Sequence, residues 1–222
     1  MKPIKALTIL ALAAVLGSCN EGQPVAQRWS EEKANEWYAA REWPVGCDYV
    51  PAYAGNQIQM WQPSTFDPAE IDKELGWAED LGFNSVRIFL HDKVWSADRD
   101  AFFANIEKFL EIADSHGISS LVTLFTNGGS RDRYVDEKIS PIPGIHNGIW
   151  AQTPGIETVN DPSQWGWVKK YEQDVLDHFK GDKRIIAWCL YNEPENVPAC
   201  HTYPLLKKVF EWAREVNPSQ PL

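Results

Sequence analysis

The sequence predicts an α/β protein built on a parallel sheet, because strand-like and helix-like segments alternate along most of the chain. Four short apolar runs, rich in branched and aromatic residues, are expected to be strands. Each is followed by a segment whose apolar residues recur at helical spacing. Strands joined through helices pair in parallel by right-handed crossovers, so one sheet covered by helices is expected.

Cap residues define several of the expected element boundaries. Asp67 followed by Pro68 is typical of a helix start, and so is Asp161 followed by Pro162. Ser30 is expected to cap a short N-terminal helix. The expected strands span residues 45–50, 85–90, 118–125 and 185–192, and the expected helices span residues 30–41, 67–82, 98–116, 161–181 and 204–216.

The fourth strand ends at a polar Asn-Glu-Pro sequence. Six of its first seven residues are apolar or aromatic, and the remaining one is Cys189. This composition predicts a strand buried on both faces of the sheet. Pro194 cannot donate a ladder hydrogen bond, so the strand should stop before it. Asn192 and Glu193 are therefore expected at the carboxyl end of a buried strand, where α/β proteins bind ligands. A solvated loop position is the alternative for Glu193, because Asn-Glu-Pro alone is not a rare sequence.

A long segment at residues 126–161 is rich in glycine, proline and charge. Loops of this length are usually functional or disordered. The segment contains His146, Asn147, Trp150 and Gln152, whose polar and aromatic groups suit a sugar ligand.

Composition narrows the class of ligand. The net charge of -10 argues against nucleic acid as a partner. Acidity combined with eleven tryptophans suits a protein that handles neutral polar ligands, since aromatic faces stack on sugar rings. The spacing of Cys47, Cys189 and Cys200 fits neither a disulfide framework nor a zinc site. Cys47 and Cys189 are expected in buried strands, as small hydrophobic residues.

The N-terminus has the pattern of an export signal. Two lysines precede an apolar stretch, residues 6–16, that is too short to span a bilayer stably. The following Leu-Gly-Ser-Cys sequence resembles a bacterial lipobox, in which Cys19 would become the lipidated N-terminus; an ordinary secretory signal is the alternative. We therefore expect a lipoprotein signal peptide at residues 1–19 and a tether with a short helix at residues 20–44. The protein would be exported and lipid-anchored to a bacterial membrane, on the periplasmic side or the cell surface.

The length of the repeating unit suggests a barrel. From residue 45 onward each strand-helix unit takes about 45 residues, and eight units would need about 350, within the range of a (β/α)8 barrel. The pattern is therefore compatible with a fold class α/β of the (β/α)8 TIM-barrel type, of which this chain would carry about the first four strand-helix units. Half a barrel leaves two open sheet edges and half a core, so a truncated sequence is expected.

Several stretches of the sequence are similar to those of one enzyme family. They lie at residues 56–61, 65–68, 74–78, 87–92, 143–147, 191–194 and 210–214. On these stretches the chain resembles the clan A glycoside hydrolases, specifically the family 5-like cellulase and xylanase group. The resemblance runs from Trp29 to Leu222, and it makes residues 45–222 the N-terminal half of a (β/α)8 glycoside hydrolase domain.

The resemblance implies a retaining glycosidase that uses no metal or organic cofactor. It implies that Glu193 is the general acid/base, that Asn192 holds the sugar 2-hydroxyl, and that Arg87 lies beneath the catalytic carboxylates. The family's nucleophile is a glutamate at the end of a seventh strand, a position for which these four units hold no candidate. The residues expected to shape the sugar subsites are His91, Trp95, His146, Asn147 and Trp150.

The implied substrate is a β-1,4-linked polysaccharide such as xylan, cellulose or mannan. Other functions stay open: a non-catalytic carbohydrate-binding lipoprotein, a degenerate half-barrel, or a half-barrel that dimerises to complete its sheet. Structural roles also stay open for single residues. These are an ion pair at the core edge for Arg87, hydrogen bonding for His91 and His146, and packing for Trp95 and Trp150.

Overall fold

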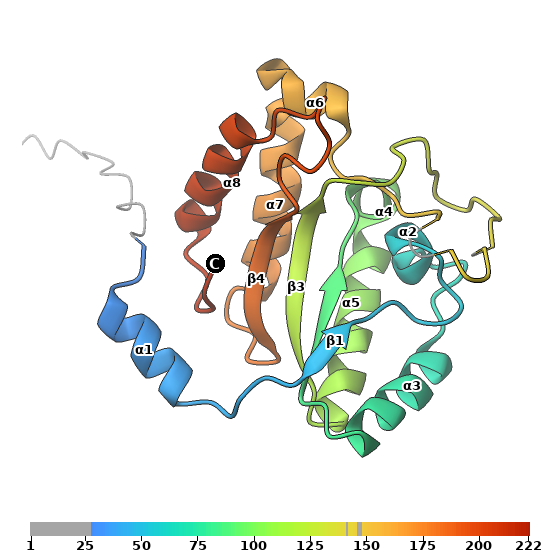
Figure 1. Cartoon of the computed structure of the whole chain (residues 1–222), viewed down its shortest axis with the longest axis vertical. Helices are drawn as coiled ribbons and strands as arrows, with labels where there is room; N and C mark the ends of the chain where they lie inside the picture. Colours follow the sequence, from blue (N-terminus) through green and yellow to red (C-terminus); the bar gives the residue numbers. More distant parts are fainter. Residues whose placement is uncertain (1–27, 141, 146–147) are drawn as a thin grey trace, which may run out of the picture.

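The computed structural model describes residues 28–222 except residues 141, 146 and 147. Its four strands form one parallel sheet in chain order, β1 (Gly46–Asp48), β2 (Ser85–Phe89), β3 (Ser119–Thr126) and β4 (Ile185–Asn192), as Figure 1 shows. The register pairs residue 87 of β2 with residue 121 of β3, and residue 123 of β3 with residue 189 of β4. The predicted α/β fold with a parallel sheet is confirmed.

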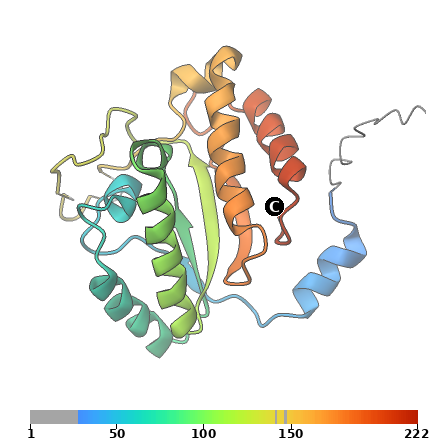
Figure 2. The same cartoon turned by 180° about the vertical axis from the view of Figure 1, so that it is seen from behind.

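Helices cover one face of this sheet. The view from behind in Figure 2 shows α5 (Arg99–Ser115) and α7 (Trp165–Phe179) across that face, with α3 (Pro68–Asp80) and α8 (Tyr203–Val216) at the two sides. By contrast, α1 (Glu31–Ala39) lies away from the sheet and has no buried residue. No helix within the described residues is long and apolar enough to cross a membrane.

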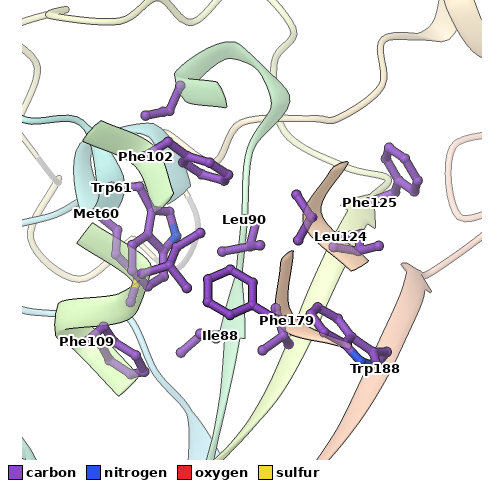
Figure 3. Packing of buried hydrophobic residues seen from close by; sticks show 14 of the residues in the cluster. Met60, Trp61, Ile88, Leu90, Phe102, Phe109, Leu124, Phe125, Phe179 and Trp188 are labelled. Atoms are coloured by element: carbon purple, nitrogen blue, oxygen red, sulfur yellow. The ribbon is translucent and has the colours of Figure 1, made fainter. Parts of the chain in front are cut away.

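The hydrophobic core fills the space between the sheet and these helices. Ile88, Leu124 and Trp188 are buried side chains of β2, β3 and β4, and Figure 3 shows them in one cluster that also contains the rings of Phe109 and Phe179. In a strand, successive side chains point to opposite faces, so one side chain in two belongs to this core. The carboxyl ends of all four strands are thereby held at one edge of the sheet.

The other face of the sheet is open, which corrects the prediction that the fourth strand is buried on both faces. Arg87, Leu121, Ala187 and Cys189 alternate with the core residues and are only partly buried. Cys47, expected in a buried strand, is exposed. A parallel sheet is covered on both faces when helices flank both sides or when it closes into a barrel, and the described residues form neither covering.

Most helix boundaries follow the predicted caps. The Ser30 hydroxyl accepts a hydrogen bond from the backbone N–H of Lys33 at 3.2 Å, and the Asp67 carboxylate accepts one from Ala69 at 3.0 Å. Both contacts satisfy N–H groups that a helix start leaves unpaired. Gly82 follows α3 with φ of +82°, a left-handed conformation that glycine adopts without steric cost.

Four short helices have no counterpart in the sequence prediction. Each is too short for apolar residues to repeat at helical spacing. One of them, at residues 156–160, lies within the expected long loop. Another, at residues 162–164, is a 3-10 turn at the start of the predicted helix 161–181, whose remainder is α7. These helices are α2 (Gln57–Trp61), α4 (Asp92–Ala97), α6 (Ile156–Asn160) and the 3-10 helix η1 (Pro162–Gln164).

One buried carboxyl, that of Glu172 on α7, works against the stability of this core. Its side chain is fully buried, and neither carboxyl oxygen has a hydrogen-bond partner among the described residues. Burial and the nearby Glu215 carboxylate raise the pKa of Glu172 well above its ordinary value. The folded state therefore binds a proton that the unfolded state releases, so stability falls as the pH rises above the ordinary carboxyl range.

The Glu172→Met variant is expected to be more stable than the parent chain. Methionine removes the unpartnered carboxyl and keeps a good helix former, so the free energy of unfolding at neutral pH should rise by about 1–3 kcal/mol. Urea denaturation at pH 6 and pH 8 checks this, and the gain should be larger at pH 8. Glu211→Met, at an exposed position of α8, should stay within about 0.5 kcal/mol of the parent. A destabilised Glu172→Met variant would show that the carboxyl is satisfied in solution.

Candidate functional site

A polar cavity of about 550 Å³ opens at the carboxyl ends of the strands. Four of the residues predicted for the site line it: Arg87, Trp150, Asn192 and Glu193. Its position matches the edge of the sheet at which α/β proteins bind ligands. The remaining lining residues come from β1, β2, the start of the long segment after β3 and the turn after β4: Asp48, Val50, Phe89, Asn127, Gly128, Gly129 and Asn196.

The Arg87 guanidinium lies at the base of this cavity. It donates hydrogen bonds to Asn192 Oδ1 at 2.7 Å, to Thr123 Oγ1 at 3.1 Å and to Cys189 Sγ at 3.2 Å. Its ion pair with Asp48 is longer, at 3.7 Å, and the Asp48 side chain is 64% exposed. An exposed pair of this kind contributes little, so the main partner of Arg87 is the Asn192 amide and not a carboxylate at the core edge.

These contacts fix the orientation of the Asn192 amide. Its oxygen accepts from Arg87, and its nitrogen donates to Thr126 Oγ1 at 3.0 Å. An arginine can only donate, so the amide oxygen must face it. One amide hydrogen of Asn192 remains for a ligand, which suits a bond to a sugar hydroxyl.

Glu193 occupies a tight turn directly after β4. Its backbone has φ of +50°, in the left-handed region, and Glu195 has φ of +65°. The Asn196 side-chain amide donates to Glu193 Oε2 at 2.8 Å, and the Glu195 backbone N–H donates to Thr202 Oγ1 at 2.6 Å. Residues held in this region cost free energy and concentrate at functional sites. The turn presents an exposed carboxyl at the cavity rim.

Three contributors to this site carried no sequence signal that assigned them a role. Asn127 is buried, its backbone N–H donates to the Asn192 carbonyl at 3.1 Å, and its Oδ1 accepts from the Tyr191 hydroxyl at 3.0 Å. Asp48 and Asn196 reach the cavity from β1 and from the turn after β4. Asp48 is the last residue of β1, Asn127 directly follows β3, and Asn196 lies in the turn after β4, so nearness to the carboxyl end of a strand is the signal that could have found them.

Trp150 lines this cavity and lies edge-on against Phe89, with ring centroids 5.2 Å apart. The other predicted site residues are not brought to it. His91 is buried as the N-cap of α4, where its Nδ1 accepts from the Lys93 backbone N–H at 3.2 Å. Trp95 lines a different cavity. The predicted residues Cys19, His146 and Asn147 lie outside the described part of the chain.

The buried position of His91 predicts a pH dependence. Burial lowers the pKa of His91 to about 4, and the nearby cations Arg131 and Lys93 act in the same direction against Asp92. The unfolded state thus binds a proton between about pH 6.5 and pH 4 that the folded state excludes, so stability is lost as the pH falls through this window. The loss should approach about 3 kcal/mol at its lower end, at roughly 1.4 kcal/mol per pH unit.

His91→Asn should flatten that slope, because asparagine keeps a capping acceptor and does not titrate in this range. Urea denaturation at several pH values from 7.5 to 4.5 measures it. His116→Asn is the contrasting control. Hydrogen bonds to the Glu79 and Asp72 carboxylates raise the pKa of His116, so its contribution to stability is complete below pH 6.5 and is lost as the pH rises through the raised pKa. A slope between pH 4.5 and 6.5 that His91→Asn leaves unchanged would contradict the prediction.

No protein-family model matches the sequence, and no curated protein matches it. Solved structures are similar in fold. The exo-beta-1,4-mannosidase Op5Man5 from Opitutaceae bacterium strain TAV5 has a TM-score of 0.59 at 21% identity, over 79% of this chain and 30% of that chain. A variant of GH5_18 from Streptomyces cattleya, in complex with Manb1-4GlcNAc, has a TM-score of 0.56 at 15% identity, over 81% and 44%. A structure described as a glycoside hydrolase has a TM-score of 0.53 at 17% identity, over 80% and 51%.

The fold and the position of the cavity place the chain among proteins with (β/α)8-barrel architecture. The chain has the fold of part of a (β/α)8 barrel, with a polar cavity at the carboxyl ends of its strands. It spans between 30% and 51% of the length of the three solved structures named above. At these identities the likeness concerns the fold.

Proposed function

We propose that this chain provides the acid/base part of the active site of a retaining glycoside hydrolase that cleaves β-1,4-linked polysaccharide. The observation that carries the proposal is the arrangement at the end of β4. The Glu193 carboxyl follows an Asn192 amide that Arg87 and Thr126 hold in one orientation, beside the Trp150 ring. The fold similarity to a mannosidase and to a protein bound to Manb1-4GlcNAc favours mannan over xylan and cellulose within this class.

The chemistry assigns a separate task to each group. Hydrolysis with retention uses two carboxyl groups about 5–5.5 Å apart, one as proton donor and one as nucleophile. Glu193, exposed at the cavity rim, would give a proton to the leaving oxygen and later take one from water. Asn192 would hold the 2-hydroxyl next to the reacting carbon. The resemblance places the second carboxyl on a seventh strand, which has no counterpart among the four strands described.

A non-catalytic carbohydrate-binding protein is the second candidate function. The same cavity, aromatic side chain and amide would bind a sugar without any hydrolysis, and the described residues include no assigned nucleophile.

We also propose that the protein is exported and carries a lipid at Cys19. The Cys19→Ser variant should incorporate no lipid, which metabolic labelling with a fatty acid measures.

The test compares hydrolysis and binding by the product of the complete reading frame and by the 222-residue chain. Mannan, xylan and cellulose are supplied in turn, and NMR follows the anomeric configuration of the first product. Hydrolysis of mannan with retention is the expected result for the complete product. Binding without hydrolysis by both proteins would favour the carbohydrate-binding function, and inversion of configuration would contradict the assigned mechanism.

A further inference from the structure

A second cavity, of about 480 Å³, is lined by α4, by the start of α7 and by the long segment that follows β3. Figure 1 shows this segment beside α4. The segment begins at the first cavity with Asn127 and Gly129, and then reaches the second cavity with Arg131 and Tyr134. One stretch of chain thus contributes to both cavities. The residues of the second cavity that matter here are Lys93, Trp95, Ser96, Arg131, Tyr134 and Trp167.

The charges at the base of this cavity are already paired. Both terminal nitrogens of Arg131 donate to the two Asp92 carboxylate oxygens at 2.8 Å. The Lys93 ammonium donates to the backbone carbonyls of Arg131 and Arg133, each at 2.5 Å. A charged ligand would need to compete with these bonds, whereas a neutral polar ligand would not. The base of the cavity therefore favours a neutral ligand.

The walls of this cavity are aromatic. Trp95 packs edge-on against Tyr171 of the core, with ring centroids 5.5 Å apart, while the residue Tyr134 is 62% exposed. Trp167 stands at the start of α7, with the Arg131 guanidinium 5.9 Å from its ring centroid. Ligand sites combine such walls with a few polar groups, here including the exposed Ser96. Trp95 Nε1 is buried without a hydrogen-bond partner among the described residues, which is uncommon away from water or ligand sites.

We propose that this cavity is a second carbohydrate-binding site, which takes one neutral pyranose unit. The apolar face of a pyranose stacks on an aromatic ring, while its hydroxyl groups match the exposed Ser96 hydroxyl at the rim. The site needs no contribution from Glu193, so it does not depend on hydrolysis. It rests on the proposed function only for the choice of glycan.

The experiment titrates the nitrogen-15 labelled 222-residue chain with mannotriose and, separately, with cellotriose. The indole N–H resonances of Trp95 and Trp167 report the second cavity, and that of Trp150 reports the first. Addition of at least one sugar at millimolar concentration should shift the Trp95 and Trp167 resonances. Tyr134→Ala should weaken the binding seen by these two resonances by about two- to tenfold, which is the usual range for an aromatic contact.

Two further variants separate this site from the first cavity. Ser96→Trp places a large side chain at the exposed rim and should abolish the response of Trp95 and Trp167 without loss of fold. Trp150→Ala should leave that response intact, and so should Trp77→Ala, which removes a tryptophan that is 57% exposed elsewhere. The proposal falls if neither sugar shifts Trp95 and Trp167, or if Tyr134→Ala and Ser96→Trp both bind as the parent does. If a sugar binds at Trp95 but the protein hydrolyses no polysaccharide, the second binding site is supported and the proposed function is contradicted.

Discussion

The Arg131→Met variant is expected to lose about 3–5 kcal/mol of its free energy of unfolding, because it leaves a buried carboxylate without its cationic partner. Asp92 is 4% exposed, and both of its carboxylate oxygens accept from Arg131 at 2.8 Å. Burial by itself would raise the pKa of Asp92, yet the neighbouring His91, the Arg131 guanidinium and the Thr153 hydroxyl hold it below its ordinary value. The charged carboxylate therefore depends on these partners.

Arg99→Met is the matched control. Arg99 also pairs with an aspartate, Asp174, at 3.0 Å, but its side chain is 51% exposed. Such a pair contributes about 0–1 kcal/mol, so the control should lose far less than Arg131→Met in urea denaturation at neutral pH. Equal losses in the two variants would show that burial does not decide the strength of the Asp92 pair. The double variant Asp92→Leu with Arg131→Met should recover part of the loss, since no unpaired charge remains.

The same ion pair links stability to the site. It joins the start of α4 to the segment that also carries Trp150, and the segment is held further by Gln57, whose Oε1 accepts from the Ala151 backbone N–H at 3.1 Å. The Asn56 side chain adds a bond to the Ile149 carbonyl at 3.0 Å. These contacts tie a long loop to α2 and α4. Arg131→Met should therefore also broaden the Trp150 indole resonance.

The sequence was sufficient where the signal is local and repeated. Alternating strands and helices predicted the parallel sheet, and Asp67 and Gly82 marked the two ends of α3 because caps act within a few residues. The Asn-Glu-Pro sequence placed Asn192 and Glu193 at the carboxyl end of β4, as observed. Each of these predictions depends on neighbours in the chain and not on distant contacts.

Predictions that depend on long-range contacts were less successful. His91 and Trp95 lie in the segment after β2 and so had the same signal as site residues, but the unpredicted helix α4 holds them away from the first cavity. Histidine is not among the usual N-cap residues Ser, Thr, Asp, Asn and Gly, so the sequence did not indicate that His91 caps α4. The role of Asn127 depends on Tyr191 and on the Asn192 carbonyl, 64 and 65 positions later in the chain, and no local pattern encodes such contacts. The open face of the sheet was not predicted, because the apolar and aromatic residues of β4 are those expected of a strand that is covered on both faces, as in a closed barrel.

Replacing Glu193 with glutamine in the complete reading-frame product is expected to lower kcat/KM on the polysaccharide substrate by about 10²–10⁴-fold. Glutamine keeps the shape of the side chain and can still pair with Asn196, but it can neither give nor take the proton. Initial rates over a range of substrate concentrations measure the loss, which should fall mainly on kcat. Glu195→Gln is the control: its Oε1 accepts from the Tyr203 backbone N–H at 2.6 Å, a bond that glutamine retains, so activity should stay near the parent value.

A Glu193→Ala variant separates proton transfer from positioning. On a dinitrophenyl glycoside the leaving group departs without a proton, so formation of the glycosyl-enzyme should stay fast while its hydrolysis becomes slow for lack of a base. Azide needs no base to attack, and it should restore turnover and give a glycosyl azide of retained configuration. An azide product of inverted configuration would make Glu193 the nucleophile, because azide would then have taken its place. Unchanged turnover of polysaccharide by Glu193→Gln would remove the chemistry from the end of β4 altogether.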